Sequence, residues 1–142
     1  MKANETKVDK FLATNETTFA IPVYQRNYDW TLFQCKQLLH DIIETGKNDK
    51  TNAHFIGSIV YVHDDVYTAS GLTELTIIDG QQRLTTITLI YIALYRLAKE
   101  LDNQMLVNRI QKTYLINEFA PEEEKLKLKP TENNKEALRH IL

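Results

Sequence analysis

The stretch Leu75-Thr76-Ile77-Ile78-Asp79-Gly80-Gln81-Gln82-Arg83 decides the fold of this chain. Its first four residues predict a β-strand, and the apolar run from Leu84 to Ala98 that follows predicts a helix. A strand that turns on a glycine into a helix leaves the first helical amides without partners, and such an end attracts anions. The turn itself carries two carboxamides, a guanidinium and a carboxylate. This arrangement predicts a phosphate or nucleotide site.

The same turn also fits a plain surface feature. Asp-Gly is a frequent turn dipeptide, and Gln81, Gln82 and Arg83 can form a solvated first helical turn. Short motifs have many false positives, so the remainder of the chain has to decide between the two interpretations.

Length and composition indicate one compact domain. The chain has 142 residues, of which 43% are hydrophobic, and this is enough apolar material for a core. Its longest apolar run, Leu89 to Leu94, is far shorter than the roughly 20 residues that a bilayer span needs. The amino terminus is polar and lacks the apolar core of a signal peptide. We therefore expect a cytoplasmic protein with no membrane partner.

Cysteine, histidine and charge exclude several classes of site. The single cysteine, Cys35, is expected to pack inside a helix, and the four histidines show no metal-ligand spacing. The formal net charge of −2 argues against a domain that by itself binds DNA mainly through phosphate contacts. Lys125, Lys127 and Lys129 alternate, which predicts the solvated face of a strand.

Periodicity and turn residues predict an α+β domain. Helices are expected over residues 6–13, 31–46, 84–98, 103–117 and 133–142, strands over residues 55–62, 75–78 and 125–129, and an extended segment over residues 19–30. The first two strands are expected to pair. Thr31 and Gln34 form a capping box that opens the second helix.

For three of the expected helices, the sequence also predicts which side chains are buried. The second helix carries a stripe at three-four spacing that predicts a core-facing side, namely Cys35, Leu38, Leu39, Ile42 and Ile43. The helix over residues 84–98 is apolar nearly all round, which predicts burial on every side and a rigidly held amino end. The helix over residues 103–117 is expected to turn Met105, Leu106, Ile110 and Tyr114 inward.

Three motifs in order resemble those of a known family. They are the segments Ile21 to Trp30, His54 to Val60 and Ile78 to Thr86, and they are similar to the amino-terminal domain of the GmrSD-type restriction endonucleases. The resemblance implies a ParB/sulfiredoxin-like fold, in which a small mixed β-sheet packs against several helices and a buried helix follows the glycine turn. It makes residues 1–142 a single ParB-like nucleotide-binding domain, the amino-terminal part of a longer protein whose carboxy-terminal nuclease region lies outside this chain.

The resemblance implies that the turn binds a nucleoside triphosphate. The residues expected to hold its phosphates are Gly80, Gln81, Gln82, Arg83, Gln25 and Arg26. Arginine suits this task because a guanidinium can clamp phosphate oxygens with two parallel hydrogen bonds. A glycine permits the close approach of a backbone to the ligand.

Further roles come with alternatives that the sequence leaves open. Asp79 is expected to hold Mg²⁺ or to serve catalysis, or else it caps the helix. His54 is a candidate general acid or base, or else a residue at a strand edge. Gly57 and Ser58 either admit the ligand closely or mark a bulge.

The aromatic residues of the first motif admit two interpretations. Tyr24 and Tyr28 can stack on a nucleotide base, whereas Trp30 is expected in the core. One departure from the wider fold group limits the chemistry. Sulfiredoxins need a cysteine in the turn, where this chain has Gln81 and Gln82, so cysteine reductase chemistry is excluded.

Two functions of different classes follow. In the first, the chain is the triphosphate-binding and hydrolysing domain of a modification-dependent DNA restriction endonuclease that acts in phage defence. In the second, it is a sensor that binds a nucleotide or DNA phosphate without turnover and controls a carboxy-terminal effector. In both, DNA is a partner of the full-length protein. A third hypothesis, a ParB-like nuclease, conflicts with the nearly neutral charge balance.

Overall fold

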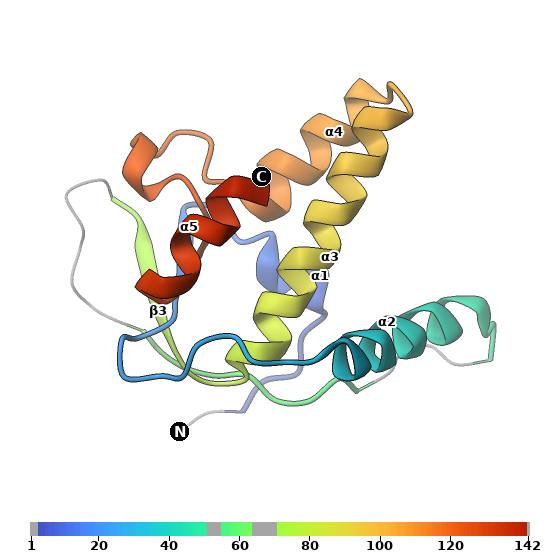
Figure 1. The fold of residues 1–142 in the computed structure, drawn as a ribbon, viewed down its shortest axis with the longest axis horizontal. Helices are drawn as coiled ribbons and strands as arrows, with labels where there is room; N and C mark the ends of the chain where they lie inside the picture. The colour runs from blue at the N-terminus through green and yellow to red at the C-terminus, as the bar shows by residue number, and fades with distance from the viewer. Residues whose placement is uncertain (1–2, 51–54, 64–70, 142) are drawn as a thin grey trace.

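The computed structural model describes residues 3–50, 55–63 and 71–141, which form an α+β fold (Figure 1). The helices in this part are α1 (Val8–Leu12), α2 (Leu32–Lys47), α3 (Gln81–Glu100), α4 (Gln104–Ile110) and α5 (Glu132–Ile141), with a π-helical turn η1 (Gln111–Leu115) and a 3-10 turn η2 (Glu122–Glu124). The strands are β1 (Thr17–Ala20), β2 (Val60–His63), β3 (Thr73–Asp79) and β4 (Leu128–Lys129). Within these ranges no helix is long and apolar enough to cross a membrane.

The strands form one small mixed sheet in the order β2-β3-β1-β4. β1 runs parallel to β3 and to β4, and β2 runs antiparallel to β3. The expected pairing of the second and third motifs is therefore confirmed. The strand predicted over residues 55–62 is shorter than expected, because β2 begins only at Val60. A register shift between Val60 and Tyr61 bends β2 opposite the end of β3.

The core lies between the sheet and α3. Phe19 pairs with Leu75 on one side and with Leu128 on the other, and all three side chains are buried. Ile77 lies two residues further along β3 and therefore points to the same face. Phe19, Ile77 and Leu84 of α3 are the largest side chains that are fully buried. The strand and the helix on either side of the glycine turn are thus both fixed by packing.

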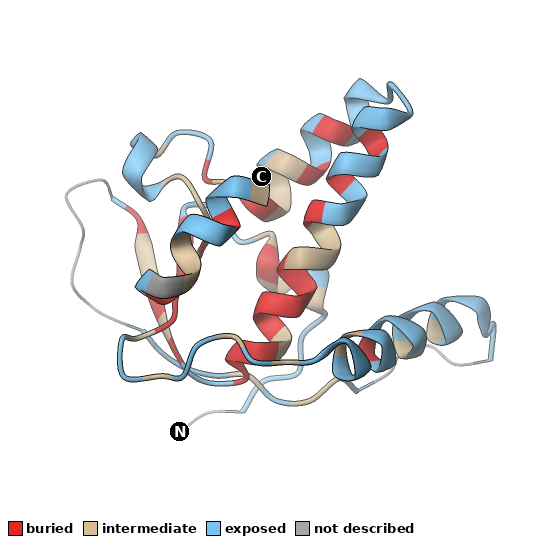
Figure 2. Ribbon diagram, in the orientation of Figure 1, coloured by how far each residue is buried: buried red, intermediate tan, exposed pale blue. Residues whose placement is uncertain are grey.

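α3 is buried all round in its first half only (Figure 2). Seven of its first eight residues are buried, and Arg83 is the one that is partly exposed. Beyond Leu89 one face remains buried, while Leu94 and Leu97 on the other side are 45% and 49% exposed. The expectation of burial on every side is therefore wrong for the second half, where α4 covers the helix from one side.

α2 begins as predicted but keeps little of its expected core face. The capping box is present, with the Thr31 amide and hydroxyl both directed at the Gln34 side chain. Of the predicted stripe only Leu38 is buried, and Cys35 is partly buried. The other three members are 39% to 44% exposed, namely Leu39, Ile42 and Ile43. The stripe is unburied because α2 projects away from the sheet, as Figure 1 shows.

The helix predicted over residues 103–117 is divided into α4 and η1, and its expected inward face is partly wrong. Met105 is 80% exposed and Leu106 is 41% exposed, contrary to the prediction, whereas Ile110 is buried as predicted and Val107 is buried beside it. The contact with α3 selects the face that contains Val107 and Ile110, three residues apart. Tyr114 follows the prediction, since its ring stacks on that of Tyr91 with the centroids 4.2 Å apart.

The alternating lysines do not share a solvated strand face. Lys127 is only 3% exposed, and its Nζ donates hydrogen bonds of 2.9 Å to the carbonyls of Leu12 and Thr14. These carbonyls lie at the end of α1, where a helix attracts a cation. Burial lowers the pKa of Lys127 to about 8. The regular strand at this point is short, because β4 covers only Leu128 and Lys129.

Candidate functional site

Gly80 forms the turn between β3 and α3 and has to be glycine. Its φ of 91° lies in the left-handed region, which disfavours every residue with a side chain. A Cβ at this position would lie 2.8 Å from the Ser58 carbonyl oxygen and 3.2 Å from the Ile59 Cα. The turn thus brings the backbone of residues 58 and 59 directly onto the start of α3. The predicted residues Gly80 and Ser58 are neighbours in space.

The amino end of α3 offers unpaired donors. The first backbone hydrogen bond of the helix runs from the Leu84 amide to the Gly80 carbonyl, at 3.1 Å. The amides of Gln81, Gln82 and Arg83 have no hydrogen-bond partner in the described part of the chain. These groups carry the positive end of the helix dipole. The local electrostatics therefore favour an anion at this turn.

Arg83 lies beside a second glycine of unusual conformation. Gly57 has a φ of 118°, and a Cβ there would lie 2.7 to 2.9 Å from Cζ, Nε and Nη1 of Arg83. The guanidinium therefore occupies space that any side chain at residue 57 would fill. Among the described residues no carboxylate forms an ion pair with Arg83. Its donors are consequently available to a ligand.

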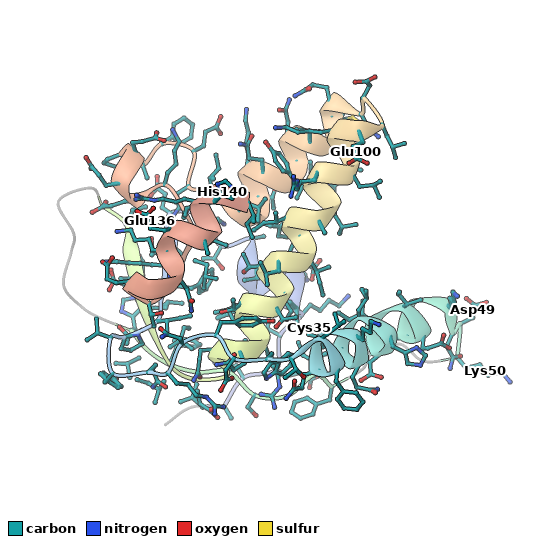
Figure 3. The ribbon with its side chains drawn as sticks, viewed as in Figure 1. Cys35, Asp49, Lys50, Glu100, Glu136 and His140 are labelled. Carbon is teal, nitrogen blue, oxygen red and sulfur yellow. The ribbon has the colours of Figure 1, made fainter. Side chains whose placement is uncertain are left out.

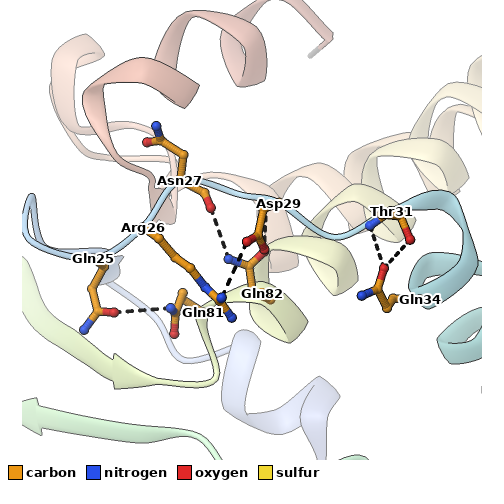
Figure 4. A network of polar contacts seen from close by, with 8 residues as sticks. All are labelled: Gln25, Arg26, Asn27, Asp29, Thr31, Gln34, Gln81 and Gln82. Atoms are coloured by element: carbon orange, nitrogen blue, oxygen red, sulfur yellow. Dashed lines mark hydrogen bonds and ion pairs between the residues drawn. The ribbon is translucent and has the colours of Figure 1, made fainter.

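The segment over residues 21–30 is fastened to this turn by carboxamides (Figure 4). Gln25 donates from Nε2 to the Ile78 carbonyl at 3.1 Å and accepts at Oε1 from Gln81 Nε2 at 3.2 Å. Gln82 accepts at Oε1 from the Asp29 amide at 3.1 Å and donates from Nε2 to the Asn27 carbonyl at 3.2 Å. The 21–30 segment thus crosses the amino end of α3 on fixed contacts.

These contacts define what the two glutamines of the turn do in this structure. Gln81 and Gln82 are 9% and 6% exposed, and both carboxamides hold the 21–30 segment. The side chain of Gln82 has its oxygen and its nitrogen engaged by backbone groups. A phosphate contact at these two positions would therefore come from their backbone amides. Their side chains position other residues.

Arg26 lies in the 21–30 segment between the anchors at Gln25 and Asn27. Its Nη1 is 3.5 Å from Oδ2 of Asp29, and the two side chains are 67% and 54% exposed. An exposed ion pair of this kind contributes little and is easily exchanged for another anion. Arg26 is thus the second guanidinium near the turn, and Figure 4 shows it between the anchoring contacts.

Asp79 is the last residue of β3 and is exposed. It lies opposite Val60 in the sheet, next to the bulge of β2. In the described parts of the chain no group of three or more His, Cys, Asp or Glu residues could hold a metal ion. Mg²⁺ in nucleotide sites needs only one or two carboxylates because phosphates and water complete its coordination, so a single carboxylate fits that mode. The candidate His54 lies outside the described residues.

The two candidate stacking tyrosines differ in their surroundings. Tyr24 is 72% exposed, and its ring is open to a ligand. The hydroxyl of Tyr28 lies 3.0 Å from Cys35 Sγ and 3.0 Å from Thr86 Oγ1, and burial raises the pKa of this phenol. Figure 3 shows Cys35 at the end of α2 that lies near α3. Tyr28 therefore links α2 to α3, and Trp30 packs against the core as expected.

Sequence reasoning missed two residues that help to hold the site. Thr131 donates from Oγ1 to Asn27 Oδ1 at 2.7 Å, across a separation of 104 residues. Asn27 lies in the first motif, but no sequence pattern predicts that it contacts Thr131. The only available signal was the position of Asn27 directly after the Gln25-Arg26 pair.

The structure brings most of the predicted site residues to one end of α3. Gly80, Gln81, Gln82 and Arg83 supply the turn, Gly57 and Ser58 lie against it, and Gln25 is bonded to it. No curated protein matches the chain significantly. The model of the family described as the amino-terminal domain of GmrSD restriction endonucleases matches residues 8–142, nearly the whole of this chain. The chain therefore belongs to the GmrSD amino-terminal domain family.

Proposed function

We propose that this chain is the nucleoside triphosphate-binding domain of a modification-dependent DNA restriction endonuclease, and that it hydrolyses the triphosphate at the β3–α3 turn. Membership of the GmrSD family supports a role in DNA restriction. One observation supports nucleotide binding most directly. The guanidinium of Arg83 has no ionic partner among the described residues and lies against Gly57 at the positive end of α3. DNA and a nuclease region would be partners in the full-length protein.

Phosphate binding would combine three kinds of group. The amides of residues 81–83 would face phosphate oxygens, as helix amino ends do in many nucleotide sites. Arg83 would clamp the phosphates with two parallel hydrogen bonds, and Arg26 would exchange its exposed partner Asp29 for the ligand. Tyr24, exposed on the same segment as Arg26, offers a ring on which the base can stack. A ParB/sulfiredoxin-like topology is part of the same proposal.

Hydrolysis would require a positioned water and a metal ion. When bound, Mg²⁺ would neutralise charge on the phosphate oxygens. Asp79 is the carboxylate at the turn and is the residue that would hold it. His54 would serve as the general acid or base. Gly57 and Ser58 would allow the β2 side of the turn to approach the ligand closely.

A sensor without turnover is the second candidate function. It is favoured by the glutamines of the turn, because the side chains of Gln81 and Gln82 are bonded to the 21–30 segment and so connect the turn to that segment. In that case the turn would bind the triphosphate and change the order of the segment. The sensor would bind a nucleotide or a DNA phosphate. Where both functions take the triphosphate, they differ only in phosphate release.

The test is calorimetric titration of the four ribonucleoside triphosphates, with Mg²⁺, into wild-type protein and three variants. We expect Arg83→Ala to weaken binding more than tenfold, since charge-assisted hydrogen bonds are about twice as strong as neutral ones. Arg83→Lys should recover only part of the affinity, because a lysine amine cannot form the two parallel hydrogen bonds of a guanidinium. Arg96→Ala, an exposed arginine on the same helix, is the matched control and should bind as wild type does.

The same samples separate the two functions. Phosphate release that is lost in Arg83→Ala would support hydrolysis, and saturable binding without release would support the sensor. Equal binding by wild type and Arg83→Ala would contradict both.

A further inference from the structure

Thr131 lies at the point where the last helix begins. It directly precedes α5, and its carbonyl accepts hydrogen bonds from the amides of Asn134 and Lys135 at 2.9 and 3.1 Å. Thr131 is 6% exposed, although its side chain is polar. Its hydroxyl donates to Asn27 Oδ1 at 2.7 Å. The start of α5 is therefore bonded to the 21–30 segment.

Asn27 is held from two directions. Its side chain accepts from Thr131, and its backbone carbonyl accepts from Gln82 Nε2 at 3.2 Å. Gln82 in turn belongs to the first turn of α3. A continuous path of two hydrogen bonds thus connects the amino end of α3 to the amino end of α5 through one residue.

The path matters because most of the 21–30 segment has no regular secondary structure. Residues 25–30 lie outside every helix and strand, and apart from the hydrogen bond from the Gln25 amide to the Pro22 carbonyl, side-chain contacts hold them in place. Arg26 lies between two of these anchors, Gln25 and Asn27. Removal of one anchor would let the arginine sample more positions. A ligand that orders Arg26 would, conversely, strengthen the remaining anchors.

We propose that Thr131 is a positioning residue of the triphosphate site, which acts through Asn27 on the segment that carries Arg26, and that the start of α5 is stabilised when the site is occupied. This inference rests on the proposed function, because it takes the triphosphate as the ligand. It adds the regulation of that site: α5 is the element that responds to occupancy. Coupling of this kind is reciprocal, so the ligand stabilises α5 by as much as α5 favours the ligand.

The first test removes the hydroxyl and keeps the branched shape. We expect Thr131→Val to bind triphosphate about threefold to tenfold more weakly, the effect of one neutral hydrogen bond. Thr131→Ser should bind as wild type does, because it retains the donor. Thr88→Val is the matched control, since Thr88 is similarly buried and its hydroxyl donates to the Leu84 carbonyl within α3, with no other partner among the described residues. Asn27→Ala removes the same bond from the other side.

A double-mutant comparison tests whether weaker triphosphate binding comes from loss of this path or from a general loss of structure. If Thr131 and Asn27 act through their one shared bond, Thr131→Val combined with Asn27→Ala should weaken binding no more than the stronger single change does. The path is overturned if the two effects on triphosphate affinity add. The thermal midpoint of each variant, measured on the same samples, shows whether the fold persists.

The second test reads α5 directly by amide hydrogen exchange. In wild type, triphosphate with Mg²⁺ should slow exchange at the amides of Asn134 and Lys135, and in Thr131→Val this slowing should disappear. Unchanged affinity and unchanged slowing in Thr131→Val would overturn the path while leaving the proposed function standing. Absence of triphosphate binding by wild type would overturn both. The two failures are therefore distinguishable.

Discussion

α2 and α3 are both expected from the sequence to bury their apolar residues, but the two helices lie in different environments. On α2, Leu39 and Ile43 remain 42% and 44% exposed, whereas the first turns of α3 bury even the polar Gln82 to 6%. The side chain of Gln82 accepts from the Asp29 amide and donates to the Asn27 carbonyl, so both polar atoms of this side chain have a partner. Apolar spacing indicates which face of a helix favours burial. A partner in the fold decides whether it is buried.

The largest expected difference between the two helices is the loss of unfolding free energy when a leucine is changed to alanine. Leu84 of α3 is 1% exposed, and Leu84→Ala should lower the free energy of unfolding by about 3 kcal/mol through lost burial and a residual cavity. Leu39→Ala on α2 should cost less than about 1 kcal/mol, because this side chain is already 42% exposed. Urea denaturation followed by circular dichroism measures both. Similar losses would mean that α2 is buried in solution, contrary to its exposure here.

The glycine turn gives the next largest effect. Gly80→Ala places a Cβ in the left-handed region and 2.8 Å from the Ser58 carbonyl oxygen, so we expect a loss of about 2 kcal/mol. The backbone of residues 58 and 59 would have to move, and triphosphate binding should weaken with it. Denaturation and calorimetry on the same variant test the two effects together. Wild-type stability would show that the turn tolerates a side chain.

Lys127 adds a buried ionisable group to the comparison of buried polar side chains, because Gln82 is buried but carries no charge. The pKa of Lys127 falls from 10.5 to about 8 in the folded protein, so between these values the unfolded state binds more protons. Stability should therefore rise with pH across this window, by about 2 kcal/mol between pH 8 and pH 10, and the full cost of the buried charge should be present below pH 8. A neutral amine keeps two N–H donors for the carbonyls of Leu12 and Thr14.

The matched control is Lys127→Met, which has no titrating group at this position. The difference in unfolding free energy between wild type and Lys127→Met should change between pH 8 and pH 10. This subtraction removes the contributions of titrating groups that both proteins share. Tyr91 is one of them, and because burial raises its pKa from 10.0 to about 12, it affects stability mainly above pH 10. A difference that is constant with pH would show that Lys127 keeps an ordinary pKa.

Local patterns predicted the elements around the turn well. The strand at Leu75, the helix after Gly80 and the capping box at Thr31 all appear in the structure, because each depends on residues close together in the chain. The pairing of β2 with β3 followed from two adjacent strand patterns. Gly57 and Arg83 are both candidate residues of the phosphate site, and the structure places the Arg83 guanidinium where a Cβ at residue 57 would lie.

What could not be predicted depends on distant partners. Lys127 resembles a solvated lysine in its alternating pattern, and only the carbonyls at the end of α1 make it a buried one. The bond from Thr131 to Asn27 joins residues 104 positions apart, and no local pattern carries it. The glutamines of the turn looked like ligand contacts. In this structure their side chains are bonded to the 21–30 segment, and no local pattern indicated these contacts.

The smallest effect should have the opposite sign, and it comes from the glycine of α2. Gly46 lies in the last turn of this helix without a positive φ, and a Cβ there would meet no atom within 4 Å. Gly46→Ala should therefore stabilise the protein by about 0.5 kcal/mol, since alanine has less backbone freedom to lose. Denaturation beside Gly80→Ala provides the comparison. Because one methyl group is added at both positions, opposite signs would show that the surroundings decide the effect, whereas a loss at Gly46 would mean that this end of α2 is covered in solution.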